Sequence, residues 1–196
     1  MPQRKPKKAT PTSKRHEAIA LLRRALSRQK KATLVDTLVE LAQADRGVLR
    51  RLTGRFDVVA APKELVAATY QAIADATAFD ERDINQNFAY DYEAYGEVKR
   101  NLGRLIDAGQ LQQAMRLTLE LMKQGSYQVE MSDEGLMTQD IEDCLDVVLK
   151  ALEKCDLPAN EVVAWCSAML DTDRVGFIAR EPLQSLRNRT QAAAAR

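Results

Sequence analysis

The chain has 196 residues, a length that suits one domain of ordinary size with a buried core. Hydrophobic residues make up 45% and charged residues 29%, a balance that excludes wholesale disorder, and no apolar run reaches the roughly 20 residues of a transmembrane helix. The net charge of +1 conceals an asymmetry, because residues 1–31 contain eleven Lys/Arg and one acid, whereas residues 32–196 carry a net charge of −9. Few aromatic residues beside abundant Ala and Leu favour helices over a β-sandwich.

The N-terminus is basic, rich in proline and almost free of apolar residues, which predicts a disordered tail over residues 1–15. No apolar segment follows it, so a secretory signal is not expected; a mitochondrial-type presequence is a weaker alternative. From His16 the spacing predicts a helix with one apolar and one basic face. The apolar face holds Ile19, Leu22 and Leu26, and the basic face holds Arg23, Arg24 and Arg28.

A second helix is expected from Thr33 to about Asp45, and its broad apolar face predicts burial on more than one side. A short turn at residues 47–52 and a connector at 55–61 lead to Pro62, which opens another helix. Residues 79–90 read as a polar loop whose two phenylalanines fold back onto the helices.

Residues 91–125 predict two amphipathic helices joined by a tight turn. Asp91 caps the first helix, Gly109 allows the left-handed conformation of the turn, and Gly125 is expected to stop the second helix. Leu105 lies on the apolar face of the first helix and is expected to be fully buried. One such pair cannot bury its apolar faces alone, so the chain is predicted to be a stack of pairs.

The C-terminal third predicts further helices after a loop at residues 126–135. A long apolar stripe runs from Met137 to Cys155, a helix begins at Pro158, and a short helix from Asp171 is halted by Pro182. The predicted fold is therefore all-α, with stacked antiparallel hairpins in a short α-solenoid or helical bundle. The expected domain covers residues 16–181, and residues 182–196 form a frayed tail.

One stretch resembles a known family. The segment Phe88-Ala-Tyr-Asp-Tyr-Glu-Ala-Tyr95, followed by Leu102, Leu105, Ile106 and Asp107-Ala-Gly109, is similar to the helical region that follows SWIM-type zinc fingers in bacterial proteins. Residues 34–52 and 151–178 resemble the preceding and closing segments of that region. The resemblance implies tetratricopeptide-like hairpins suited to interaction. The CxC…CxH zinc ligands of the finger are absent from this sequence, so no metal site or functional residue carries over.

The basic N-terminal arm is a candidate for contacts with nucleic-acid phosphates, and a solubilising tail on an acidic body is the alternative. The candidate contacts are Arg4, Lys5, Lys7, Lys8, Lys14, Arg15, Arg23, Arg24 and Arg28.

Tyr90, Tyr92 and Trp165 are candidate protein contacts, because large aromatic side chains often anchor partners. The alternative for the tyrosines is packing in the core, since Tyr92 lies on the apolar stripe. For Trp165 the alternative is a contact between paired helices.

The sequence offers little for catalysis or for metal binding. Cys144, Cys155 and Cys166 lack the short spacing of zinc ligands and suit buried thiols in a reducing, cytoplasmic compartment. His16 has no nucleophile or carboxylate arranged around it in sequence. The acids from Glu130 to Asp146 lack the order of a calcium loop and read as a solvated helix face. No catalytic residue, metal or cofactor is therefore expected.

These observations favour a non-enzymatic scaffold that binds another protein through a groove between helical hairpins. The alternative is a nucleic-acid-associated protein that docks through residues 4–31. No membrane partner is expected, and the sequence leaves the oligomeric state open.

Overall fold

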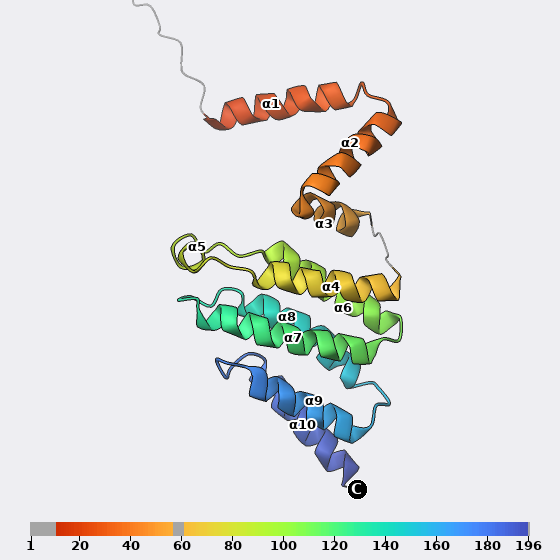
Figure 1. The fold of residues 1–196 in the computed structure, drawn as a ribbon, viewed down its shortest axis with the longest axis vertical. Coiled ribbons are helices and arrows are strands. Elements are labelled where there is room, and N and C mark those ends of the chain that lie inside the picture. Colours follow the sequence, from red (N-terminus) through yellow and green to blue (C-terminus); the bar gives the residue numbers. More distant parts are fainter. Residues whose placement is uncertain (1–10, 57–60, 196) are drawn as a thin grey trace, which may run out of the picture. The chain divides into compact units, whose positions relative to one another are not determined.

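Helices make up all the regular secondary structure in the described part of the chain, residues 11–56 and 61–195 of a computed structural model (Figure 1). This confirms the all-α prediction. The helices are α1 (Pro11–Leu26), α2 (Lys31–Ala44), α3 (Arg46–Arg55), α4 (Pro62–Thr77), α5 (Glu81–Gln86), α6 (Tyr92–Asp107), α7 (Leu111–Glu130), α8 (Thr138–Leu152), α9 (Ala159–Thr172) and α10 (Arg180–Ala194). The chain divides into two units, residues 1–52 and 53–196, rather than forming the single domain expected over residues 16–181.

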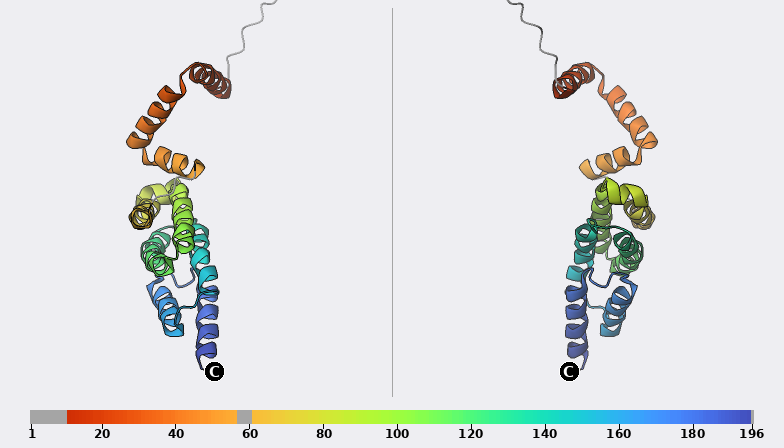
Figure 2. Two further views of the ribbon diagram at one scale, coloured as in Figure 1. Left: turned by 90° about the vertical axis from the view of Figure 1, so that its right-hand side faces the viewer. Right: turned by 90° about the vertical axis from the view of Figure 1, so that its left-hand side faces the viewer.

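The second unit is built of two layers of helices (Figure 2). One layer contains α4, α7 and α9, and the other contains α6, α8 and α10. Across the layers α4 packs on α6, α7 on α8 and α9 on α10, so three antiparallel pairs follow one another along the stack. The short helix α5 lies in the connection within the first pair, where Asp80 caps it by accepting the N–H groups of Arg82 and Asp83.

The hairpin of α6 and α7 is the junction between two pairs and not a pair itself. Gly109 takes φ 73° at the turn, as its place in the sequence predicts. However, α6 packs more extensively on α4 and α8 than on α7, because its apolar stripe faces α4 in the opposite layer and α8 beside it in its own layer. Tyr95, Val98 and Leu105 on this stripe are all buried, which confirms the predicted burial of Leu105.

Gly125 does not end the second helix of the hairpin, and this prediction is wrong. Helix α7 continues through it to Glu130, because Ser126, Gln128 and Val129 are buried and stabilise the last turn by tertiary packing. The glycine serves close packing instead. A Cβ atom at position 125 would lie 2.8 Å from Cδ1 of the buried Ile141 on α8.

Substituting two helical glycines with alanine should therefore change stability in opposite directions. We expect Gly125→Ala to lower the free energy of unfolding by about 1–2 kcal/mol, because overpacking against Ile141 outweighs the better helix propensity of alanine. Gly103→Ala should raise it by about 0.5–1 kcal/mol, because no described atom outside the adjoining backbone of α6 and the two neighbouring residues lies within 4 Å of the added methyl group. Urea unfolding curves of the two variants measure both changes. Stabilisation by both would show that Ile141 moves aside freely.

The C-terminal segment is helical and packed, so the predicted frayed tail over residues 182–196 is wrong. Pro182 lies in the first turn of α10, where a backbone N–H has no partner within the helix and proline is tolerated. Leu183 and Leu186 are buried. The proline that reads as a stop signal thus belongs to the start of a helix.

The loop predicted at residues 79–90 contains α5, and its two phenylalanines differ. Phe79 packs against the core, with its ring centroid 5.8 Å from that of Tyr127. Phe88 has φ 53° and an exposed side chain, so only one of the two folds back as predicted.

The first unit has almost no core of its own. Helix α1 begins at Pro11, so the predicted tail is helical over residues 11–15, and residues 1–10 lie outside the described part of the chain. Among described residues of this unit only Ala42 and Arg50 are buried. The apolar residues of α2 are largely exposed, with Leu38 at 40%, and the predicted burial of this helix on more than one side is wrong. The apolar pattern is present, but no neighbouring helix of this unit lies alongside to cover it.

Candidate functional site

The second unit carries a cleft of about 600 Å³ between α8 and the segment that leads from α9 into α10. It combines acidic side chains with an apolar floor. Its lining residues are Gln139, Glu142, Asp143, Asp146, Leu149, Gly176, Phe177, Ala179, Arg180, Glu181 and Pro182.

Residues 173–179 form one wall of this cleft, and the carboxylates of Asp173 and Glu142 fix the backbone of this segment by hydrogen bonds. The Oδ1 atom of Asp173 accepts the N–H of Val175 at 3.1 Å, and its Oδ2 atom accepts the N–H of Ile178 at 2.9 Å. The Oε1 atom of Glu142 on α8 accepts the N–H of Ala179 at 2.9 Å. Ala179 is the N-cap of α10 and has φ 49°, a conformation that these contacts help to maintain. Glu142 therefore joins α8 to the start of α10.

The acidic side of the cleft is open to solvent and carries two ion pairs. Lys99 Nζ lies 2.7 Å from Asp143 Oδ2, and Lys150 Nζ lies 2.6 Å from Asp146 Oδ2. The hydrogen bond from Lys99 lowers the pKa of Asp143, and the same bond raises the pKa of Lys99. Both pairs are half-exposed, so water and ions screen them and an incoming cation can compete for the carboxylates.

Phe177 gives the cleft an exposed apolar contact. Its side chain is 55% exposed. The short helix predicted from Asp171 is wrong, because α9 continues to Thr172 and residues 173–179 form a non-helical segment whose backbone N–H groups bind Asp173. A carboxylate-rich cleft beside an exposed ring can bind a cationic, partly apolar segment. Sequence reasoning missed this site, and the only local signal was the Asp-x-x-Gly-Phe run at residues 173–177.

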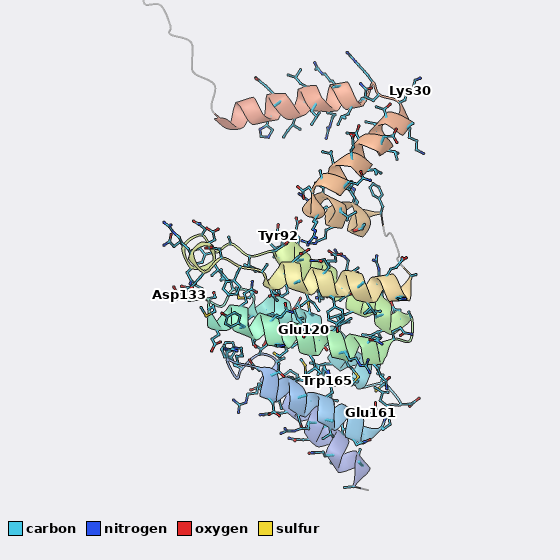
Figure 3. The ribbon with its side chains drawn as sticks, in the orientation of Figure 1. Lys30, Tyr92, Glu120, Asp133, Glu161 and Trp165 are labelled. Carbon is cyan, nitrogen blue, oxygen red and sulfur yellow. The ribbon has the colours of Figure 1, made fainter. Side chains whose placement is uncertain are left out.

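The predicted protein contacts do not form one surface. Trp165 is 5% exposed where α9 faces α7, and its Nε1–H donates to the carbonyl of Met115 at 2.9 Å (Figure 3). Tyr90 is half-buried and donates its hydroxyl to Asp140 at 2.8 Å. Burial, followed by the hydrogen bond to Asp140 and its charge, raises the pKa of Tyr90 to about 12. Only Tyr92, which is 64% exposed at the start of α6, is free to act as a surface anchor.

The candidate nucleic-acid contacts fall in three groups. Arg4, Lys5, Lys7 and Lys8 lie outside the described residues. Lys14 and Arg15 belong to α1, and their side chains are not described. Arg23, Arg24 and Arg28 are exposed in α1 and the turn that follows it, so their side chains are accessible to a partner.

Two of the three cysteines have the surroundings of structural rather than reactive thiols. Cys144 and Cys166 are buried, and burial raises the pKa of their thiols to about 12 and about 11. Cys155 is partly buried. Since the thiolate is the reactive form, the two buried groups act as small apolar side chains, as expected. Over residues 11–56 and 61–195, no three His, Cys, Asp or Glu side chains gather closely enough to share a metal ion.

Within the same described ranges, no helix combines the length and apolar character that crossing a bilayer requires. Comparison of the sequence with protein-family models, with curated proteins and with solved structures gives no match. The resemblance to the helical region of SWIM-type zinc-finger proteins therefore stays a prediction.

Proposed function

We propose that the chain is a non-enzymatic scaffold that binds a protein partner, and that the cleft between α8 and α10 receives a basic segment of that partner with an apolar anchor. The observation that carries this proposal is the combination of an open cleft, lined by four carboxylates against one arginine, and the exposed ring of Phe177. A volume of about 600 Å³ lies within the range of roughly 300–1,000 Å³ that is typical of ligand pockets. A cleft of this size accommodates a few side chains of a partner rather than a folded domain.

The layered arrangement of the second unit supports the proposed role as a binding scaffold. The first helices of the three pairs begin at Pro62, Leu111 and Ala159, a spacing of roughly 48 residues that is close to the length of known helical repeats. Stacked helical pairs of this kind present extended surfaces on which partners bind. We therefore interpret the second unit as a short helical-repeat array.

A displayed peptide library tests the cleft. The full chain should enrich peptides that combine Lys or Arg with a large apolar residue, because these complement the carboxylates and Phe177. A double variant, Phe177→Ser with Asp146→Lys, should bind the enriched peptides at least tenfold more weakly. Tyr92→Ser is the matched control, since it removes another exposed aromatic ring of the same unit. Absence of enrichment, or equal binding by the double variant, would reject the cleft as the binding site.

Nucleic-acid association through the basic arm is a second candidate, which the exposure of Arg23, Arg24 and Arg28 favours. Phosphate contacts release counterions, so this function requires a steep loss of affinity with rising salt. Replacing the three arginines with glutamine should reduce the slope of log K against log[salt] by roughly 2–3. A titration of duplex DNA in which wild type and variant bind equally weakly would remove this candidate.

A further inference from the structure

Three connections of the second unit lie at one edge of its helical array (Figure 1). They lead from α4 to α6, from α7 to α8 and from α9 to α10, and together they form the loop edge: residues 78–91, 131–137 and 173–179. Each of them exposes one large apolar side chain, and the exposed fractions are 53% for Phe88, 46% for Leu136 and 55% for Phe177. The connections on the opposite edge, residues 108–110 and 153–158, expose none. Among the connections of this unit, exposed apolar side chains are therefore confined to one edge.

The beginning of α8 holds the three connections together. The hydroxyl of Tyr90, two residues after the exposed ring of the first connection, donates to Asp140 at 2.8 Å. The N–H of Ala179, two residues after the exposed ring of the third connection, donates to Glu142 at 2.9 Å. Leu136 lies two residues before α8 itself. The exposed side chains therefore belong to one fixed framework and follow the order of the helical pairs.

Left-handed backbone conformations occur at all three exposed side chains. Gly135 has φ 59° and directly precedes Leu136, and Gly176 has φ 75° and directly precedes Phe177. Phe88 itself has φ 53°, which is a strained conformation for a bulky residue. Its exposed ring gives the core little in return for this strain. Backbone strain of this kind is concentrated at binding sites, so we interpret Phe88 as a side chain that serves an interaction.

The charge of the loop edge complements a basic partner. Its residues include seven carboxylates and two arginines, a net charge of −5, and one of these arginines, Arg174, forms an ion pair with a carboxylate of α7. Asp133 and Glu134 are exposed in the same short connection as Leu136 (Figure 3). At the third connection the cleft around Phe177 is lined by four carboxylates against one arginine. Acidic groups therefore accompany the apolar side chains along the edge, and a partner with Lys or Arg between its apolar residues fits both.

We propose that the cleft and the loop edge form one continuous site for an extended, basic segment of a partner protein, whose apolar side chains contact Phe177, Leu136 and Phe88 in turn. This inference rests on the proposed function, in which the cleft receives the first of these side chains. Packed helices lie about 8–10 Å apart and an extended chain spans about 3.3 Å per residue, so segment residues about three positions apart reach neighbouring contacts. The inferred ligand therefore carries a large apolar residue at about every third position, with Lys or Arg between.

Two synthetic peptides of equal length and equal lysine content test the proposal in fluorescence anisotropy titrations of the full chain. One carries three leucines, at every third position, and the other carries one leucine, with serine in place of the other two. The three-leucine peptide should bind at least tenfold more tightly. Phe88→Ser and Leu136→Ser should each weaken it at least fivefold and leave the one-leucine peptide unchanged, whereas Phe177→Ser should weaken both. Tyr70→Ser is the control, because this exposed ring lies on α4, outside the loop edge.

Phe88→Gly separates binding from folding. It should raise the urea midpoint of the second unit, because glycine adopts the left-handed conformation without strain, and it should also weaken the three-leucine peptide. A lower midpoint would show that the ring is structural and would overturn its role in binding.

Equal affinity for the two peptides, or full affinity for the three-leucine peptide in Phe88→Ser and Leu136→Ser, would overturn the extended site and leave the cleft as a binding site. Binding of neither peptide would overturn the proposed function as well. Self-association of the full chain that Leu136→Ser abolishes would assign the loop edge to a second copy and overturn the proposal.

Discussion

Leu105→Ala should lower the free energy of unfolding of the second unit by about 2–5 kcal/mol. Leu105 is completely buried on α6, the helix that packs on both α4 and α8. Truncation therefore removes apolar contacts on two sides and leaves a cavity between helices that are already held by other neighbours. Because the neighbouring helices cannot easily move to close this cavity, the loss of unfolding free energy should lie toward the upper part of the range.

Trp165 makes this prediction measurable. It is the only tryptophan of the chain and is buried in the second unit, so its fluorescence reports the unfolding of that unit and not of α1 or α2. Leu136→Ala is the matched control, because this leucine is exposed and its truncation should cost less than about 0.5 kcal/mol. A loss below about 1 kcal/mol for Leu105→Ala would show that the contact of α6 with its neighbours is looser than the structure has it.

Periodicity in the sequence predicted which residues of α6 and α8 face inward, because a regular apolar stripe leaves one orientation that buries it. Leu105, Ile141 and Leu145 are buried as their spacing indicates. The ends of helices were less predictable. Gly125 and Pro182 are local stop signals, but tertiary packing continues α7 through the glycine, and the proline lies in a first turn. Local chemistry allows a helix to end at such residues without requiring it.

The cleft and helix α2 show two other features that the sequence alone did not predict. Glu142 reaches the backbone of Ala179, 37 positions away along the chain, and no local pattern indicates that contact. For α2 the pattern correctly indicated an apolar helix, yet the first unit by itself does not bury it. Apolar periodicity predicts that a surface needs cover, and it does not say what provides that cover.

Gln128→Leu is expected to cost about 2–5 kcal/mol, although the two side chains have similar volumes, because it would strand two buried polar groups at about 1–3 kcal/mol each. Gln128 on α7 is completely buried. Its Oε1 atom accepts the hydroxyl of Tyr95 at 2.5 Å, and its Nε2 atom donates to the carbonyl of Ala76 at 3.1 Å. That carbonyl lies in the last turn of α4, where no partner four residues on is available within the helix. One amide therefore links α4, α6 and α7.

A double-mutant cycle separates the two bonds of this amide. Tyr95→Phe alone should cost about 1–3 kcal/mol, because it leaves the Oε1 atom of Gln128 unpaired. Combining it with Gln128→Leu should cost less than the sum of the single changes, since both partners of the hydroxyl–amide bond are then apolar. The loss of unfolding free energy that Gln128→Leu still causes in the Tyr95→Phe background is due to the carbonyl of Ala76, which is then unpaired. Gln112→Leu is the control, as this exposed side chain donates a hydrogen bond to the exposed Glu161 at 3.2 Å and not to a buried group. Strict additivity would mean that the two side chains do not share a bond, so that the amide of Gln128 would link α7 to α4 but not to α6.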